Sequence, residues 1–412
     1  MPWYIALSAS IILILIGIYK KVNIGLTMLL GALALGILSG LPLSALLRIF
    51  FEGLTNRITI MLAFSILLLG ILGNILKETG ALRELVENLQ ELVSDIRIIS
   101  MAMPALIGML TVPGGAILSA PLCAETGKKL DLPPQRQAAV NIWFRHVLYF
   151  MLPLFPSLIL TSQLSGVSMS RLVFFNLPLT IVGIISGFYF LFRGYKDGNK
   201  GYHFSAKRLL NLLRSILPLI IIMFLVIFFD LYFPLAILFG TVLAILNYLP
   251  VNRTATVIFN RFKTMIFPGL NYSVVLVIIG IMIYKEMLEE SAVLVDMTNL
   301  ILGLGIPILL LIVCIPFIIG MLTGDNSASV AIVFPMLIPL LPAASQTAYT
   351  AYIAYIYVSS TAGHIISPAH PCFSLTKEYF REEIKGILLP ILPLLLIVMI
   401  TGLLLTLAII NL

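Results

Sequence analysis

The chain has 412 residues, of which 60% are hydrophobic and 10% are charged, and its formal net charge is +7. Soluble proteins carry about 25% charged residues, so this composition excludes a water-soluble fold. The surplus of Lys and Arg is what the cytoplasmic loops of membrane proteins collect, and it requires no nucleic-acid partner. Cys123, Cys314 and Cys372 lack metal-ligand and disulfide spacing, so we expect them to be inert.

Apolar runs of roughly 18 to 22 residues recur along the chain, which is the length that a helix needs to cross about 30 Å of hydrocarbon. The first run has its basic pair at the wrong end for a signal peptide, so we expect a retained helix. The pattern predicts an all-α polytopic membrane protein with about ten transmembrane helices, at residues 2–19, 22–41, 57–76, 137–164, 170–193, 208–229, 231–250, 266–287, 346–381 and 386–410.

Two amphipathic stretches interrupt this series, at residues 78–97 and 288–303. In the first, Leu and Val recur on one helical face and the acids lie away from it, so the helix is expected along the membrane interface. An interrupted apolar segment follows each stretch, at residues 98–125 and 306–342. Gly, Pro and polar residues at its middle predict a re-entrant hairpin, and the alternative is a single kinked helix that spans the membrane.

The placement of Lys and Arg tests the number of crossings. With ten crossings and two hairpins that do not cross, one side receives 20 of these residues and the other receives Arg48, Arg57, Arg171 and Lys285. The basic side is then cytoplasmic, so both termini are predicted outside a multi-pass protein of the cell inner (plasma) membrane.

The sequence also repeats itself. "IGMLT" occurs at residues 107–111 and 319–323, and "PLFPSLILT" at 153–161 matches "PAHPCFSLT" at 368–376 in its prolines and its final Leu-Thr. The offsets are 212 and 215 residues, so residues 1–200 and 205–412 are predicted to be repeats. Each contains five crossings and is therefore inserted upside down relative to the other, as in inverted-repeat transporters. Broken helices are expected at residues 137–164 and 346–381.

Helices that break within the membrane expose backbone N–H groups and positive dipole ends, so four converging breaks favour a small anion. Glycines permit close approach of a ligand, and hydroxyls can complete its hydrogen bonds or bond back to their own helices. The candidate substrate-binding residues are Thr111, Pro113, Gly114, Gly115, Ser119, Arg145, Ser157, Thr161, Thr323, Asn326, Ser327, Ser367, His370 and Thr376.

Three charged or titratable side chains are expected at depth. Asp325 is a candidate Na⁺ ligand or proton carrier, with Asn326 beside it, and the alternative is a structural cap on the following half-helix. Arg145 is a candidate for the substrate anion, and snorkelling or pairing with an acid is the alternative. His370 is a candidate donor to substrate, and His364 is expected to pack nearby. No cofactor is expected beyond Na⁺ or H⁺ as the coupling ion.

Three motifs carry a resemblance to a known family. "TVPGGAILSAP", "NIWFRHVLYFMLPLFPSLIL" and "ISPAHPCFSLTKEYF" resemble domain-of-unknown-function family 401, grouped with the ion transporter superfamily of gluconate and citrate permeases and divalent anion/sodium symporters. The resemblance implies a homodimer in which a scaffold domain holds mobile elevator-type transport domains. The dicarboxylate branch of that superfamily carries a Ser-Asn-Thr signature at each hairpin tip, whereas the tips of this sequence read Thr111-Val-Pro-Gly-Gly and Thr323-Gly-Asp-Asn-Ser.

These observations predict a secondary active transporter of a small organic anion, of the carboxylate class, coupled to Na⁺ or H⁺. The alternative within transport is a cation/proton antiporter without an organic substrate. An intramembrane hydrolase or lipid-modifying enzyme is the third interpretation, although no spacing resembles a nucleophile elbow or a paired-His metal motif. The chain is therefore not expected to be an enzyme.

Overall fold

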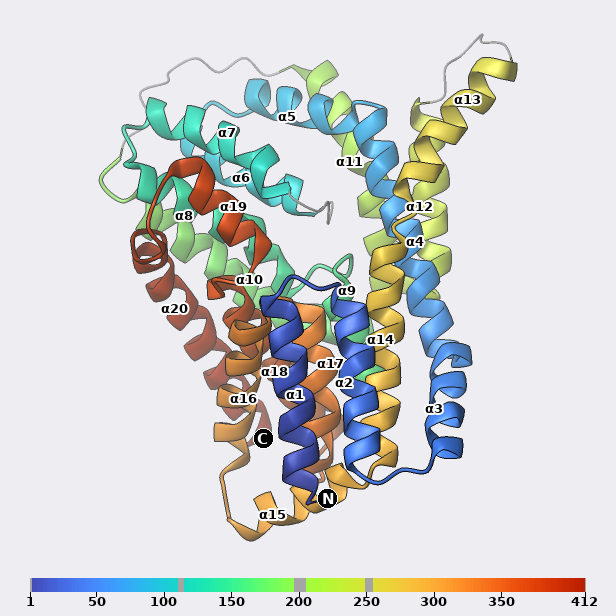
Figure 1. The fold of residues 1–412 in the computed structure, drawn as a ribbon. Coiled ribbons are helices and arrows are strands. Elements are labelled where there is room, and N and C mark those ends of the chain that lie inside the picture. The colour runs from blue at the N-terminus through green and yellow to red at the C-terminus, as the bar shows by residue number, and fades with distance from the viewer. Residues whose placement is uncertain (1, 110–114, 196–204, 249–254, 412) are drawn as a thin grey trace.

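The first half of the chain is helical throughout its regular structure. The computed structural model describes residues 2–109, 115–195, 205–248 and 255–411, and no strand occurs in these ranges (Figure 1). The first half contains α1 (Trp3–Tyr19), α2 (Ile24–Leu38), α3 (Leu43–Thr55), α4 (Arg57–Glu78), α5 (Ala81–Leu92), α6 (Ile96–Gly108), α7 (Gly115–Lys129), α8 (Pro134–Val147), the 3-10 turn η1 (Leu148–Phe150), α9 (Pro156–Ser165) and α10 (Met169–Phe192).

The second half follows a similar order of elements. Both halves contain, in the same order, a long helix, an amphipathic or short helix, a packed helix pair, a broken helix and a final long helix. The second half contains α11 (Ala206–Phe229), α12 (Phe233–Tyr248), α13 (Ala255–Ile266), η2 (Phe267–Gly269), α14 (Tyr272–Glu290), α15 (Val293–Gly303), α16 (Ile308–Thr323), α17 (Asn326–Leu337), η3 (Ile338–Leu340), α18 (Gln346–Ile366), α19 (Pro371–Phe380) and α20 (Ile384–Ile410).

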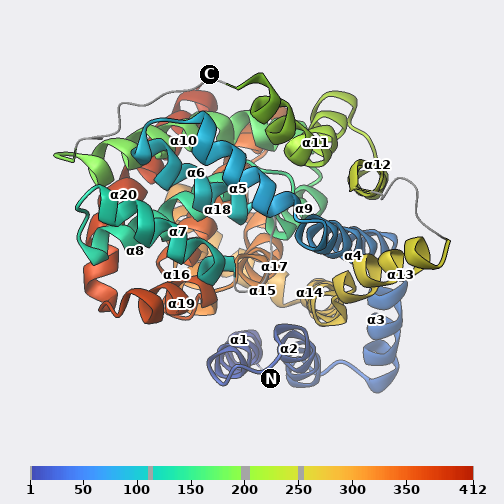
Figure 2. The same ribbon diagram turned by 90° about the horizontal axis from the view of Figure 1, so that it is seen from above.

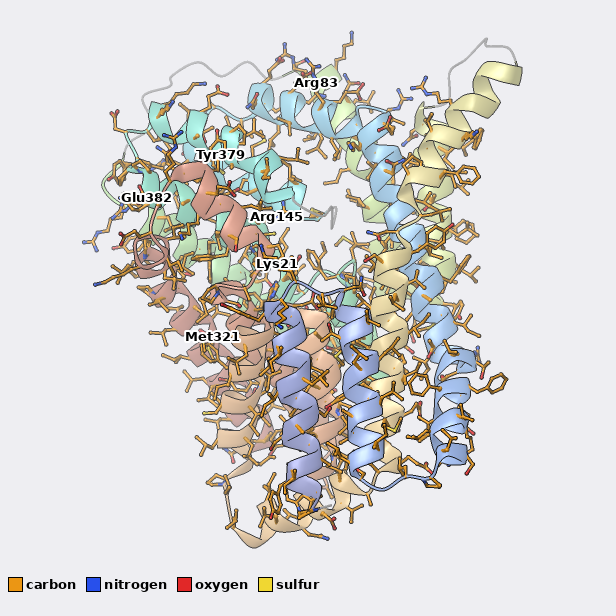
Figure 3. The ribbon with its side chains drawn as sticks, in the orientation of Figure 1. Lys21, Arg83, Arg145, Met321, Tyr379 and Glu382 are labelled. Atoms are coloured by element: carbon orange, nitrogen blue, oxygen red, sulfur yellow. The ribbon has the colours of Figure 1, made fainter. Side chains whose placement is uncertain are left out.

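Five described helices are long and apolar enough to cross a membrane: α4, α10, α11, the continuous stretch Arg261–Glu290 and α20. The expected crossings at 2–19 and 22–41 instead fold as α1 and α2, with 17 and 15 residues. A helix needs about 20 residues to cross the hydrocarbon, so each of these two is short. Figure 3 shows Lys21, in the turn between these two helices, near the mid-height of the molecule.

Two helices were not expected from the sequence. α3 occupies a segment expected to be a loop, and α13 precedes the expected crossing at residues 266–287 and joins it through η2. They have 13 and 12 residues, so a search for apolar runs of membrane-spanning length does not find them. The expected amphipathic stretches do fold as helices, α5 and α15.

The two interrupted segments fold back on themselves. α6 packs against α7, and α16 packs against α17. A single helix, even a kinked one, would hold its two ends apart, so the arm-to-arm packing excludes that alternative. Figure 1 shows the pair α6–α7 toward the upper end of the molecule and the pair α16–α17 toward the lower end.

The helices form two groups, seen from above in Figure 2. Helices α1–α5 and α11–α15 form one group, joined by pairs such as α2–α14 and α4–α12, and we call this the framework. Helices α6–α10 and α16–α20 form the other, joined by pairs such as α16–α18 and α10–α20, and we call this the hairpin group. The two groups meet chiefly where α14 contacts α17 and α10 contacts α11, and α4 makes a smaller contact with α9.

Candidate functional site: a cavity at three helix breaks

A cavity of about 570 Å³ lies between the framework and the hairpin group. The framework contributes the α1–α2 turn, Ile66 of α4 and the first turns of α14. The hairpin group contributes the breaks of α8–α9, α16–α17 and α18–α19. Its polar wall consists of Asn23, Arg145, Tyr149, Ser157, Asn271, Ser273, Asp325, Asn326, Ser327, His364, His370 and Cys372.

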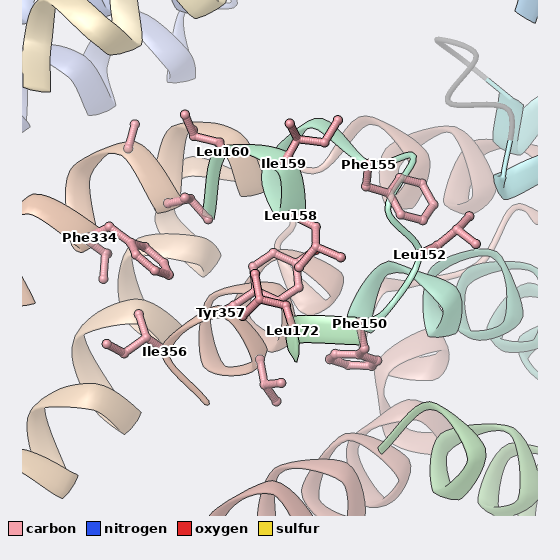
Figure 4. Packing of buried hydrophobic residues seen from close by; sticks show 14 of the residues in the cluster. Phe150, Leu152, Phe155, Leu158, Ile159, Leu160, Leu172, Phe334, Ile356 and Tyr357 are labelled. Carbon is pink, nitrogen blue, oxygen red and sulfur yellow. The ribbon is translucent and has the colours of Figure 1, made fainter. Parts of the chain in front are cut away.

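The first break separates α8 from α9. Pro153 and Pro156 lack the backbone N–H that would continue a helix, and Pro156 is the first residue of α9, where its fixed φ is favourable. Apolar side chains pack around the break from several helices, as Figure 4 shows for Phe150, Phe155 and Phe334. The break is therefore a packed feature of the core, and it orients Ser157 in the first turn of α9 toward the cavity.

The second break lies between α16 and α17. Gly324 ends α16 with φ +62, a left-handed conformation that favours glycine. The Asp325 carboxylate then accepts a hydrogen bond of 2.8 Å from the Ala328 N–H, so it caps α17. This is the structural role that the sequence offered as an alternative, and Asp325 also lines the cavity. No ion pair involving Asp325 occurs among the described residues.

The third break lies between α18 and α19, and it packs directly against the second. The Ser367 hydroxyl donates to the Met321 carbonyl at 2.6 Å, and His364 Nδ1 lies 3.1 Å from the Gly324 carbonyl oxygen. Pro371 begins α19, with His370 as its N-cap residue. The expected breaks at 153–157 and 367–372 are thus helix interruptions in the structure, each with its second proline at the start of the following helix.

Arg145 is a buried positive charge beside the cavity. It belongs to the last turn of α8, is 3% exposed, and lies on the cavity wall (Figure 3). Its Nε and Nη1 have no hydrogen-bond partner among the described residues. The guanidinium lies against Gly115 at the start of α7, where an added Cβ would be 2.9 Å from Nη1. A buried cation with unused donors costs several kcal/mol unless a counter-ion approaches it.

A polar network supports the cavity from behind. Asn326 Nδ2 donates to the hydroxyls of Ser157 and Thr361, each at 3.0 Å, and Asn326 Oδ1 accepts from Ser360 at 2.8 Å. The Tyr357 hydroxyl lies 3.3 Å from Ser157 Oγ. Sequence reasoning did not single out Ser360 or Thr361 on α18, because nothing local to that helix indicates which of its faces meets α17.

Thr111, Pro113 and Gly114 fall outside the described residues. Of the predicted residues that the structure does describe, several lie away from this cavity. Ser119 and Thr376 instead join a separate buried network, in which Ser119 donates to Asn141 Oδ1 at 2.6 Å and Asn141 donates to Thr376 at 2.9 Å. The hydroxyl of Thr161 bonds to the Ser157 carbonyl of its own helix, and that of Thr323 bonds to Ile319. Ser367 bonds across to α16 and does not line the cavity.

Three of the four histidines lie close together, with His364 and His370 on the cavity wall and His146 buried behind it. His146 Nε2 lies 2.9 Å from His370 Nε2, and the ring centroids of His364 and His370 are 4.0 Å apart. Cys372 completes the cluster: its ligand atom and those of His146 and His370 all lie within 4.8 Å of one another. The expectation that all three cysteines are inert did not anticipate this environment, because the histidines come from another helix and from the residue before a proline.

The chain resembles known proteins in two respects. Its sequence matches a family model over nearly its whole length, and its fold resembles that of a solved structure. The model of the family described as protein of unknown function (DUF401) matches residues 4–410. Among solved structures, the chain is similar to the YdaH transporter of Alcanivorax borkumensis, with a TM-score of 0.60, 16% sequence identity and 87% of each chain covered. At this identity the likeness is one of fold. None of the curated proteins compared with the chain matches it.

Proposed function

Because the chain belongs to the DUF401 family and shares its fold with a solved transporter, we propose that it is a secondary active transporter of a small organic anion of the carboxylate class. Transport is driven by Na⁺ or H⁺. The substrate occupies the cavity between the framework and the hairpin group, whose volume of about 570 Å³ suits a small molecule.

Arg145 is the observation that carries the proposal. Its guanidinium is buried on the cavity wall and has unused donors on Nε and Nη1, so the wall lacks a negative charge that a carboxylate would supply. The start of α9 adds Ser157 and the start of α17 adds Asn326 and Ser327 beside the same cavity. Helix N-termini favour anions, so their dipoles reinforce the guanidinium.

Asp325 is the proposed site of the coupling ion. Its carboxylate lines the cavity and caps α17 through Oδ1, and Oδ2 is the proposed ligand for the cation or the proton. A carboxylate at such depth is stabilised by a bound cation or by protonation. Binding of the coupling cation next to the substrate anion would neutralise both, which lowers the electrostatic cost of moving them together.

The elevator mechanism and the inverted repeats belong to the same proposal. Reciprocal helix pairs support the repeats, because α2 of the first half packs on α14 of the second, and α12 of the second packs on α4 of the first. The grouping into a framework and a hairpin group supports a moving part and a fixed part. The resemblance to the ion transporter superfamily supports a homodimer held together by the framework. The mass of the detergent-solubilised protein tests whether the protein is a dimer.

The proposal is tested by ligand binding and then by transport. A melting-temperature screen of small organic acids, with Na⁺ and without it, should find acids that stabilise the protein, because a ligand that binds only the folded state raises the melting temperature. Uptake of a radiolabelled hit into proteoliposomes should then be driven by an imposed Na⁺ or H⁺ gradient. If no organic acid stabilises the protein and none is taken up, the proposed substrate class is wrong.

Asp325→Asn tests the coupling assignment. Asn is also a good N-cap residue, so α17 should keep its cap while the charge is lost. Counterflow of substrate should persist and its dependence on the ion gradient should disappear. Unaltered coupling in this variant would reject the assignment of Asp325.

A cation/proton antiporter is the second candidate, favoured by the Asp325 carboxylate on the cavity wall. It requires that added Na⁺ collapse a pH gradient across proteoliposomes in the absence of any organic anion. The transporter of organic anions predicts no collapse under these conditions, so one dye-based measurement separates the two.

A further inference from the structure

Two histidines and a cysteine from distant parts of the chain converge beside the cavity, where His370 and Cys372 line the wall and His146 is buried behind them. His146 belongs to the last turn of α8, whereas His370 and Cys372 flank the start of α19. The two Nε2 atoms are 2.9 Å apart, and the Cys372 sulfur lies within 4.8 Å of both. The anion-binding role proposed for the cavity does not use these side chains.

His146 is in the tautomer that a metal ligand needs. His146 Nδ1 is 2.7 Å from the Ile142 carbonyl oxygen, so Nδ1 carries the proton and Nε2 presents a lone pair. Metal-binding histidines have this arrangement, in which the outer nitrogen donates to a carbonyl and fixes the tautomer. His370 Nδ1 is buried without a partner among the described residues, so this ring is free to exchange tautomers.

Cys372 is placed to supply a sulfur ligand. It is the second residue of α19, and its thiol contacts Arg145 and His146. A metal ion binds cysteine as the thiolate, so binding releases the thiol proton. Cys372 also lines the cavity, so an ion that enters the cavity has access to the sulfur.

We propose that His146, His370 and Cys372 form a binding site for a soft d¹⁰ metal ion, with Cu(I) preferred to Zn(II). Thiolate and imidazole ligands select such ions. Two neutral imidazoles and one thiolate give a neutral complex with Cu(I), whereas Zn(II) leaves a net positive charge next to the Arg145 guanidinium. The low-dielectric wall therefore favours the monovalent ion.

The geometry needs only a small adjustment to accept an ion. Bond lengths of about 2.0–2.1 Å to nitrogen and about 2.3 Å to sulfur place ligand atoms roughly 3.3–3.8 Å apart. The two imidazoles must therefore separate slightly and the sulfur must approach. A hydrogen-bonded histidine pair with a structural role alone is the competing explanation, and it predicts no affinity for metal.

Competition with a chromophoric Cu(I) chelator tests the site on the purified full-length protein. The wild type should remove one Cu(I) per chain from the chelator, and Cys372→Ser and His370→Ala should each weaken binding at least tenfold. Cys314→Ser is the matched control, because Cys314 lies within α16 and outside the cluster, and it should bind as the wild type does. Stoichiometric binding that survives Cys372→Ser, or no binding by the wild type, would overturn the proposal.

Thiol protection provides a test that keeps Cys372 in place. In a chain with Cys123→Ser and Cys314→Ser, maleimide should react with Cys372 alone, and Cu(I) should slow that reaction at least tenfold. Adding His146→Ala should abolish the protection, whereas protection that persists would contradict the assignment of His146. A Zn(II) arm that protects better than Cu(I) would overturn the stated preference. None of these measurements involves an organic anion, so their failure is separate from failure of the proposed transport activity.

Discussion

The two halves of the molecule share a packed helix pair with a glycine at one end of an arm, but side chains of opposite charge lie beside that glycine. In each half the glycine lies against the broken helix that follows. Gly115 begins the second arm of the first pair, whereas Gly324 ends the first arm of the second pair. In the first half Gly115 lies against the Arg145 guanidinium. In the second half Gly324 lies against the Ala369–His370 backbone, and the charged neighbour is Asp325.

The difference indicates that the two halves bind different ions. The repeated backbone explains why helix N-termini meet at one cavity, but the backbone dipoles of the two halves have the same sign. The side chains distinguish the halves, because the cation of the first half suits a substrate anion and the carboxylate of the second suits a coupling cation. The predictions below test this separation of roles, beginning with the largest expected effect.

Arg145→Gln should cause the greatest loss of function. Removing one partner of a buried charge pair costs about 2–5 kcal/mol, so the substrate Kd should rise by at least ~30-fold. The substrate-free protein should melt at the same temperature or higher, because an unpaired buried charge has been removed. Binding is measured by calorimetry on the purified protein. Arg136→Gln, in the first turn of the same helix and outside the cavity, is the control and should keep the wild-type Kd.

The two glycines should respond differently to alanine. At residue 324 the new Cβ would lie 2.7 Å from the Ala369 carbonyl carbon in a left-handed backbone, so Gly324→Ala should lower stability by about 2 kcal/mol or more. At residue 115 the Cβ meets the end of a side chain that can move, so Gly115→Ala should displace Arg145 and weaken substrate binding while costing under about 1 kcal/mol.

Thermal unfolding in detergent and substrate binding measure the two effects separately. Gly80→Ala is the control for backbone strain, because Gly80 has φ +80 and an added Cβ would meet nothing within 4 Å. A Gly324→Ala variant no less stable than Gly80→Ala would contradict the close packing of the second hairpin on α19.

The two buried asparagines provide the next comparison. Asn326→Ala and Asn141→Ala each remove several buried hydrogen bonds, so each should lower the free energy of unfolding by about 1–3 kcal/mol. Only Asn326 lines the cavity, so only Asn326→Ala should also weaken substrate binding in excess of its loss of stability. Equal effects of the two variants on the substrate Kd would show that the cavity is not the binding site.

The smallest predicted effect is a change in stability at acid pH, and it arises because the first helices of the two hairpins are capped differently. Asp95 caps α6 and its hydrogen bond with Arg97 lowers the pKa of the carboxyl, whereas α16 begins at Pro307 without a side-chain cap. A lowered pKa in the folded state means that the stabilisation is present above the usual aspartate pKa and is lost as the pH falls below about 4.

Asp95→Asn should therefore flatten the acid-side decline in melting temperature while changing stability near neutral pH by under about 0.5 kcal/mol, since Asn also caps helices. The measurement is a series of thermal unfolding curves between neutral and acid pH. A steeper acid-side decline in the variant would contradict the capping role.

The sequence was informative about the broken helices because their signals are local. Pro156 and Pro371 each begin a helix, and the repeated pentapeptide marks both helix pairs. Arg145 could also be proposed, because a charge within an apolar run needs an explanation. The Asn326 network and the His146–Cys372 cluster could not be predicted, because they depend on which helix faces meet across some two hundred residues of chain. α3 was missed because its 13 residues are too few for a membrane-spanning run.

Cysteine labelling from each side of the membrane tests the central claim that two oppositely inserted halves build one cavity. Lys128→Cys, at the end of α7, and Ala344→Cys, between η3 and α18, would be introduced singly into a chain whose three native cysteines are replaced by serine. Lys128 and Ala344 are both exposed. The account predicts that an impermeant maleimide applied outside intact cells labels residue 344 and not residue 128. Labelling of both positions from the same side would contradict it.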